Sequence, residues 1–230
     1  MADLILQQFA RSPVPGRVKT RLQPALGPEQ ACDVHRDLVT WTADQLLASG
    51  LGVVELWVAG EADDPLFQML LARGVAALRI QEGEDLGARM CAALRDGCGR
   101  ASGALLVGSD CPGIDAAYLA MAAASIKGAD LVLGPAEDGG FVLIGGRKAP
   151  PPALFDDTIW GSSSVLDSTL KRAAQLGLDV SLLPCLRDID RLEDLDFWFE
   201  LVSTQRAGND PPAGGACGGA SQAGQGRAEP

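Results

Sequence analysis

The sequence has a single histidine, and this shortage excludes several kinds of catalytic centre. His35 is the only histidine among 230 residues. A histidine-rich metal site is therefore excluded, and any Ser-His-Asp or Cys-His catalytic set would have to use this one residue. His35 falls within an expected helix, where we expect it at the surface.

Basic charge and long apolar runs are also scarce. The chain has 30 acidic and 19 basic residues, a net charge of −11, so its field repels nucleic-acid polymers and anionic membranes. No apolar run approaches the ~18 residues that a membrane span needs. The N-terminus lacks the pattern of a signal peptide, and the six cysteines form no C-x-x-C pair. We expect a cytoplasmic protein with free thiols, in which a local basic cluster could still hold a small anionic ligand.

Short β-rich runs alternate with helical patterns over most of the chain. This alternation predicts a parallel sheet covered by helices on both faces. The expected strands are residues 4–10, 53–59, 75–80 and 104–108, and the expected helices are 28–47, 65–73, 86–95 and 116–125.

The pattern then changes. The strands expected at 129–135 and 141–146 are joined by AEDGG, which is too short for a crossover helix and predicts an antiparallel reversal. A helix at 163–176, a strand at 180–184 and a helix at 192–203 complete a domain spanning 1–206. The sheet is thus predicted to be mixed but mostly parallel. Residues 207–230 are rich in glycine and alanine, and we expect them to form a disordered tail.

Ligands bind beyond the carboxyl ends of strands in open α/β sheets, so the segments that leave those ends carry the candidate chemistry. The first, RSPVPGRVKTRL (11–22), lacks the spacing of a phosphate-binding P-loop. Its glycine nevertheless allows close approach of the backbone, and Arg11, Arg17, Lys19 and Arg21 can neutralise phosphate oxygens. The alternative is a solvated basic loop.

Acidic residues follow two other strands. Asp110 lies just after the apolar strand ALLVG, where a carboxylate suits Mg²⁺ or Mn²⁺, although it could instead cap the next helix. Asp188 and Asp190 follow the strand VSLLP and could supply a second ligand. Glu137 or Asp138, in the AEDGG turn, could act as general base on an acceptor hydroxyl.

Six motifs in this order resemble a bacterial glycosyltransferase-A-like family related to nucleotide-diphospho-sugar transferases, some of whose members are described as arsenosugar biosynthesis glycosyltransferases. The motifs are FARSPVPGRVKTRL, QEGEDLGARM, GSDCP, LGPAEDGGFVLIGG, WGSSSVLDSTL and DIDRLEDL. The chain departs from the family pattern at Arg11, Phe141 and the Arg191–Leu192 pair, where the family usually has Lys, Tyr and Thr-Pro.

The resemblance implies a three-layer Rossmann-like sandwich of the glycosyltransferase-A type. It also implies that Asp110 holds the metal, completed by Asp190, or failing that Asp188, as in related molybdenum-cofactor and 2-phospholactate guanylyltransferases. The residues expected to contact the nucleotide and its phosphates are Arg11, Pro15, Gly16, Arg17, Lys19, Thr20, Arg21, Gln81 and Gly87.

The leading hypothesis is a glycosyltransferase that depends on Mg²⁺ or Mn²⁺ and moves a sugar from a nucleotide diphosphate to a small hydroxyl-bearing acceptor. One alternative is a nucleotidyltransferase that joins an NTP to a phosphorylated small molecule, because both reactions need nearly the same site. The other is a nucleotide-binding protein without catalysis.

Overall fold

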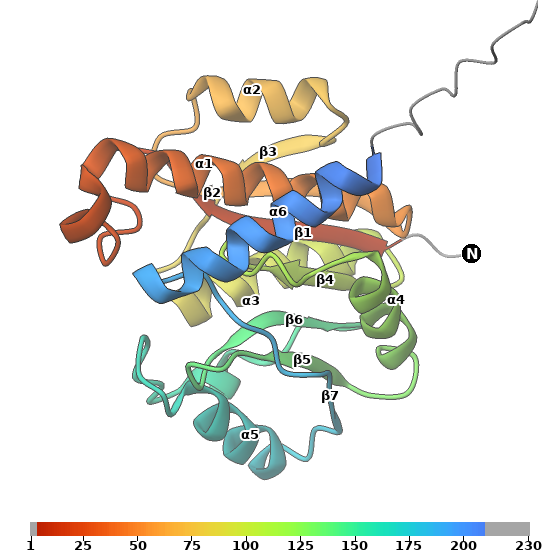
Figure 1. Cartoon of the computed structure of the whole chain (residues 1–230). Coiled ribbons are helices and arrows are strands. Elements are labelled where there is room, and N and C mark those ends of the chain that lie inside the picture. Colours follow the sequence, from red (N-terminus) through yellow and green to blue (C-terminus); the bar gives the residue numbers. More distant parts are fainter. Residues whose placement is uncertain (1–3, 210–230) are drawn as a thin grey trace, which may run out of the picture.

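The computed structural model describes residues 4–209, in which seven strands form one sheet. The strands are β1 (Leu4–Arg11), β2 (Gly52–Ala59), β3 (Ala77–Ile80), β4 (Ala104–Val107), β5 (Leu131–Pro135), β6 (Phe141–Gly146) and β7 (Val180–Leu182). Their order across the sheet is β3-β2-β1-β4-β6-β5-β7 (Figure 1).

The helices largely follow the predicted ranges. They are α1 (Gln23–Ser49), α2 (Pro65–Ala72), α3 (Leu86–Arg100), α4 (Ala116–Ser125), α5 (Val165–Gln175) and α6 (Leu195–Asn209), with short 3₁₀ turns η1 (Pro152–Phe155) and η2 (Leu192–Asp194). Gly27, at φ 79°, interrupts α1, so its regular part begins at Pro28, as predicted. The side chains of Asp64, Asp85 and Asp115 cap α2, α3 and α4 by accepting backbone N–H groups.

Strand directions confirm the mixed, mostly parallel α/β sheet. β1 is parallel to β2 and β4, and β2 is parallel to β3. β6 is antiparallel to both β4 and β5, whereas β5 and β7 are parallel. Because β6 runs backwards, it begins at the edge of the sheet where its parallel neighbours end. The AEDGG turn that precedes β6 therefore lies at the same edge as the loops that follow β1 and β4.

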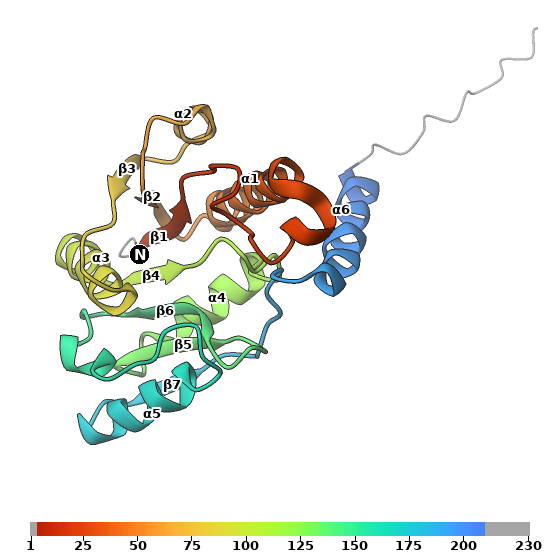
Figure 2. The same ribbon diagram turned by 90° about the vertical axis from the view of Figure 1, so that its left-hand side faces the viewer.

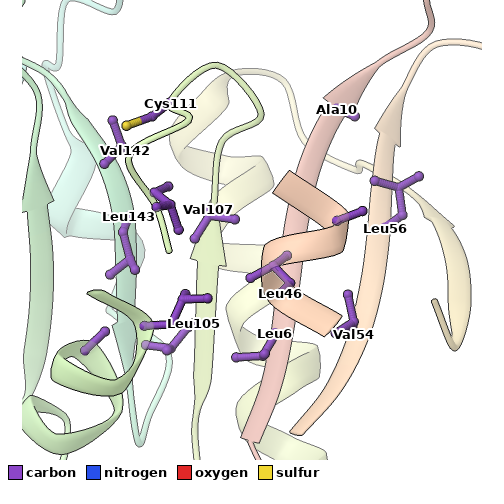
Figure 3. Packing of buried hydrophobic residues seen from close by; sticks show 14 of the residues in the cluster. Leu6, Ala10, Leu46, Val54, Leu56, Leu105, Val107, Cys111, Val142 and Leu143 are labelled. Carbon is purple, nitrogen blue, oxygen red and sulfur yellow. The ribbon is translucent and has the colours of Figure 1, made fainter. Parts of the chain in front are cut away.

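Alternate residues of β1 face two separate hydrophobic cores. Leu4, Leu6 and Ala10 belong to a cluster that includes residues of α1, α2 and α4, part of which is seen in Figure 3. Ile5 and Phe9 belong to a second cluster with residues of α3 and α5. This period of two is expected of a central strand whose two faces are both covered by helices.

Helix α6 adds a smaller layer outside α1, and the two helices lie side by side in both views (Figures 1 and 2). The rings of Trp41 on α1 and Trp198 on α6 meet edge to face, with centroids 5.2 Å apart. Such a contact stabilises beyond the area it buries. It anchors the end of the segment that carries the DIDRLEDL motif.

Several smaller predictions also meet the structure. The five cysteines within residues 4–209 are free thiols, as expected. No helix in this range is long and apolar enough to cross a bilayer. Helix α6 continues to Asn209, so the predicted domain boundary after residue 206 falls inside a helix. The remainder of the predicted tail, 210–230, lies outside the described residues.

An ion network centred on the buried Glu55 joins β2, β3 and α3. The Glu55 carboxylate is 2% exposed and accepts hydrogen bonds from Arg79 Nε at 3.2 Å and Arg100 Nη2 at 2.7 Å. Substituting Glu55→Gln keeps the shape but removes the charge that both guanidinium groups need. We expect the free energy of unfolding to fall by about 1.5–3 kcal/mol, measured by urea denaturation.

The matched control for that measurement is Glu61→Gln, which changes an exposed glutamate. It should alter stability by no more than about 0.5 kcal/mol. Equal stability of the two variants would contradict a stabilising role for the Glu55 network.

Candidate active site

A cleft of about 680 Å³ opens at the edge where β1, β3 and β4 end. Of the thirteen site residues predicted from sequence, nine line it: Arg11, Arg17, Lys19, Thr20, Arg21, Gln81, Asp110, Asp138 and Asp190. Pro15, Gly16, Gly87 and Glu137 are not among the lining residues. The structure thus brings the basic loop and acidic residues from three separate segments into one cavity.

Polar side chains inside the fold fix the floor of this cleft. Gln8 on β1 is fully buried, and its Nε2 donates to Ser109 Oγ and to the Val39 carbonyl of α1, each at 2.9 Å. The Ser109 hydroxyl donates in turn to the Phe9 carbonyl at 2.7 Å. Buried polar groups are costly unless hydrogen-bonded. These bonds therefore lock the residue just before Asp110 against the central strand.

Lys19 and Asp110 form the central ion pair of the cleft. Lys19 Nζ lies 2.6 Å from Asp110 Oδ1, and the Lys19 side chain is 4% exposed whereas that of Asp110 is 54% exposed. Burial raises the pKa of Asp110, but the charge of Lys19 outweighs it, so the pKa lies below the usual value. Asp110 is therefore a carboxylate at neutral pH.

The segment after β7 supplies the remaining acidic groups. Its backbone joins the cleft because the Ile189 N–H donates to the Asp110 carbonyl at 2.8 Å. Asp190 pairs with Arg21 of the basic loop. Asp194 accepts the N–H groups of Asp190 and Arg191 at 3.0 and 2.7 Å, so its carboxylate holds this turn in place.

Asp188 differs from Asp190 in its surroundings. Its Oδ1 is buried and has no hydrogen-bond partner among the described residues. Burial, together with the negative charges of Asp110 and Asp138, raises the pKa of Asp188 to about 7. Asp188 is not among the residues that line the cleft, but its unpartnered oxygen feels the negative charge of two carboxylates that do, and a cation would stabilise such a position.

Of the two candidate bases, Asp138 lines the cleft and Glu137 does not. Asp138 Oδ1 accepts the Gly140 N–H at 2.8 Å, which fixes the carboxylate. Gly139, at φ 88°, also needs to be glycine because a Cβ there would lie 2.1 Å from the Ser163 carbonyl oxygen. The turn therefore packs closely against the loop that begins at Trp160.

The expectation of a surface histidine is wrong. His35 is 4% exposed, lines the cleft and bonds through Nε2 to the Arg11 carbonyl at 3.0 Å. Helix α1 packs across the carboxyl end of β1, and this contact removes the side chain from solvent. Burial lowers the pKa of His35, so the ring is neutral at pH 7. Its position suits holding the end of β1 rather than proton transfer.

An apolar wall faces the charged side of the cleft. Leu86, Met90, Phe141 and Trp160 all line it, and the Trp160 ring packs on Phe155 with centroids 5.6 Å apart. Gly87 lies behind this pair: a Cβ at that position would come within 2.7 Å of Phe155 and 2.9 Å of Trp160. The structure therefore gives Gly87 a packing position, outside the residues that face the cavity.

The aromatic wall, His35 and Ser109 were missed from the sequence. Trp160 stands in one of the six motifs, WGSSSVLDSTL, but nothing in its spacing indicated a cleft position. Ser109 directly precedes the predicted metal ligand, so proximity was a usable signal. No signal in the sequence indicated a cleft position for His35, because it reaches the cleft from the middle of a helix.

The sequence profile of one family matches residues 42–162, just over half of the chain. It is described as "Uncharacterized protein conserved in bacteria (DUF2064)". The chain belongs to the DUF2064 family. The matched segment includes Asp110, Asp138 and Trp160, whereas the basic loop and the DIDRLEDL motif lie outside it. No curated protein matches the sequence.

Solved structures share the fold of this DUF2064 protein. A proposed nucleotide-diphospho-sugar transferase from Desulfovibrio desulfuricans G20 is 29% identical, with a TM-score of 0.78 over 87% of this chain and 88% of that one. The inositol-1-phosphate CTP transferase from T. maritima is 18% identical, with a TM-score of 0.60 over 90% and 98%. A Mycobacterium tuberculosis H37Rv protein in complex with manganese is 18% identical, with a TM-score of 0.51 over 86% and 98%.

These matches confirm the glycosyltransferase-A-like architecture and the relation to the nucleotide-diphospho-sugar transferase superfamily. None of these three structures is described as an arsenosugar enzyme, so that part of the resemblance stays a prediction.

The close packing around Gly87 predicts that any added side-chain atom lowers the stability of the protein. Gly87→Ala is expected to lower the free energy of unfolding by about 1–3 kcal/mol, because Phe155 and Trp160 would have to move. Gly99→Ala in the same helix meets nothing within 4 Å. It should be neutral or stabilise by up to about 1 kcal/mol. Chemical denaturation of both variants tests this, and equal effects would contradict it.

The environment of Asp188 predicts a pH-dependent gain in stability on its removal. Its folded pKa of about 7 lies above the ordinary value of 3.8. The folded state therefore favours the protonated form, and this contribution is lost as pH rises from 3.8 through 7. In metal-free protein, Asp188→Asn should melt a few degrees above wild type at pH 8 and close to it at pH 4.

Asp190→Asn serves as the control, since Asp190 is paired with Arg21. It should bring no such gain at pH 8. A difference between Asp188→Asn and wild type that does not change with pH would refute the prediction.

Proposed function

We propose that this DUF2064 protein is a metal-dependent glycosyltransferase that moves a sugar from a nucleotide diphosphate to a small hydroxyl-bearing acceptor. The observation that carries the proposal is the meeting of basic and acidic groups in one cleft. Lys19 and Arg21 contact the carboxylates of Asp110 and Asp190 at the edge of the sheet. A diphosphate with its metal presents the complementary charges, anionic oxygens and a cation, to these two sets of side chains.

The basic loop is proposed to grip the diphosphate. Arg11 and Arg17 line the cleft and are exposed there. Guanidinium groups bind phosphate oxygens in bidentate fashion, and each charge-assisted bond contributes about 1.5–3 kcal/mol. His35 supports this arrangement by bonding to the Arg11 carbonyl, which fixes the start of the loop.

The carboxylates of Asp110, which lines the cleft, and of Asp188, which does not, fit a hard divalent cation. Within residues 4–209, no three His, Cys, Asp or Glu side chains gather as a ready metal site. Mg²⁺, however, is usually held by one or two carboxylates together with substrate phosphates and water. Asp110 and Asp188 would hold Mg²⁺ or Mn²⁺, because Asp188 Oδ1 is buried and unpartnered whereas Asp190 is paired with Arg21. When bound, the cation would offset the negative charge of the diphosphate leaving group.

Asp138 is proposed to be the general base. It lines the cleft, and the Gly140 N–H orients its carboxylate. Once the acceptor hydroxyl lies within hydrogen-bond reach, Asp138 can remove its proton as the oxygen attacks the sugar carbon. Glu137, which does not line the cleft, is not assigned this role.

Similarity to the Desulfovibrio protein, a proposed nucleotide-diphospho-sugar transferase, supports the sugar-transfer reaction, at 29% identity over most of both chains. Nucleotidyl transfer is the second candidate, because the T. maritima CTP transferase has the same fold. In that reaction the same basic side chains would hold an NTP, and a phosphate group of the acceptor would attack the NTP. Cytoplasmic localisation stays a prediction.

The released product separates the two reactions. Purified protein with Mn²⁺ is incubated with panels of nucleotide sugars and NTPs in the presence of candidate acceptors. Release of a nucleoside diphosphate supports glycosyl transfer, whereas release of pyrophosphate assigns the protein to nucleotidyl transfer. Failure of both compound classes to bind in calorimetry would overturn the proposal.

Variants test the metal ligands in the same calorimetric assay. Asp110→Asn and Asp188→Asn should each weaken Mn²⁺ binding to the nucleotide complex by about 10- to 100-fold, because each removes an anionic ligand. Asp190→Asn should have a smaller effect, and Asp63→Asn, an exposed control, should have none. A larger loss with Asp190→Asn than with Asp188→Asn would reassign the second ligand to Asp190.

A further inference from the structure

The Lys19 ammonium group bridges two of the three segments that carry the carboxylates of the cleft. It lies 2.6 Å from Asp110 Oδ1 and also donates to the Ile189 carbonyl. Ile189 stands between Asp188 and Asp190, and its N–H bonds back to the Asp110 carbonyl at 2.8 Å. One positive charge is therefore held where the strand ends after β4 and β7 converge.

The backbone of Lys19 is fixed in an uncommon conformation. Its φ is 45°, one of two positive values at non-glycine residues in the described range. Such conformations persist only where surrounding contacts determine them, and they cluster at functional sites. Here the Lys19 carbonyl accepts the Leu22 N–H at 2.9 Å, and the adjacent Val18 side chain is buried. The loop thus presents the Lys19 side chain inward, onto Asp110.

Arg21 makes a contrasting contact nearby. Its pair with Asp190 leaves the two side chains 60% and 41% exposed. Exposed pairs contribute little and exchange readily with solvent. Lys19 is enclosed, so its pairing with Asp110 is the stronger of the two and the harder to break.

Lys19 and a divalent cation compete for the same carboxylate. A cation that binds Asp110 while Lys19 stays would place two positive centres a few ångströms apart in a partly buried site, which is strongly unfavourable. Lys19 can leave only if another anion satisfies its ammonium group. Among the ligands of the proposed function, the diphosphate is that anion, and it would lie in the same cleft.

We propose that the cleft accepts a divalent cation only as part of a metal–diphosphate complex. Lys19 stays paired with Asp110, and thereby blocks free metal, until diphosphate oxygens bind its ammonium group instead. The inference rests on the proposed function, and it deepens it by specifying the form of the ligand. Free metal is excluded by Lys19, which acts as a positioning residue that exchanges one anionic partner for another.

The test measures Mn²⁺ binding to the full chain by calorimetry, without any nucleotide. Lys19→Met keeps the aliphatic stem and removes the competing charge, so free Mn²⁺ should bind at least about 10-fold more tightly than to wild type. Lys19→Arg keeps the charge and should bind Mn²⁺ as weakly as wild type. Lys171→Met, which removes an exposed lysine that does not line the cleft, should leave the affinity for free Mn²⁺ unchanged.

A second titration repeats these measurements with a nucleoside diphosphate present. In wild type the diphosphate should tighten Mn²⁺ binding. The ratio of the Mn²⁺ affinities with and without diphosphate should be smaller in Lys19→Met, because no lysine needs to be displaced. Thermal melting verifies that each variant is folded, and Lys19→Gln replaces Lys19→Met if the latter is not.

The outcomes separate this inference from the proposed function. If wild type binds the diphosphate with Mn²⁺ but loss of the Lys19 charge leaves free Mn²⁺ affinity unchanged or weaker, the role of Lys19 is wrong and the proposed function stands. If wild type binds neither the diphosphate nor Mn²⁺ with it, the proposed function itself is overturned.

Discussion

The ion pair between Lys19 and Asp110 is the contact on which the geometry of the cleft depends. It connects the loop after β1 to the loop after β4, and the second bond of Lys19, to the Ile189 carbonyl, adds the segment after β7. A buried lysine without a partner would be strongly destabilising. The three segments are therefore held together as one unit, in which the loop after β1 carries the cations and the segments after β4 and β7 carry carboxylates.

Backbone hydrogen bonds continue the parallel pairing of β5 and β7 and connect this unit to the AEDGG turn. The Leu186 N–H donates to the Pro135 carbonyl, and the Glu137 N–H donates to the Leu186 carbonyl, each at 3.0 Å. They guide the chain from β7 past the AEDGG turn towards Asp110. Asp138 follows β5, which runs in the same direction as β4, so its turn lies at the edge where the parallel strands end.

Some buried polar groups around the cleft have hydrogen-bond partners, and others do not. Gln8 Nε2, Ser109 and Asp194 are each engaged by hydrogen bonds that fix neighbouring residues of the cleft. Asp188 is not, since its Oδ1 is buried without a partner among the described residues. A fold that leaves one carboxylate oxygen in this state loses stability in the absence of a cation, a cost that proteins accept at functional sites. Other buried polar atoms, among them Gln8 Oε1 and Trp160 Nε1, also lack a partner among the described residues, but Asp188 Oδ1 is the one that belongs to a carboxylate.

Local patterns in the sequence determined the elements and the edge of the sheet that carries the cleft. Pro28 predicted the start of the regular part of α1, and the short AEDGG link predicted the antiparallel pair, because both depend on contacts between near neighbours in the chain. The basic loop, Asp110 and Asp138 were placed correctly in one cavity, since the carboxyl ends of strands in such sheets converge. The tertiary structure alone decided which groups touch. The pairing of Lys19 with Asp110, the burial of His35, the exclusion of Glu137 from the cleft and the isolation of Asp188 all arise between segments far apart in the chain. No local periodicity encodes such contacts, because they depend on how whole helices and strands pack against one another.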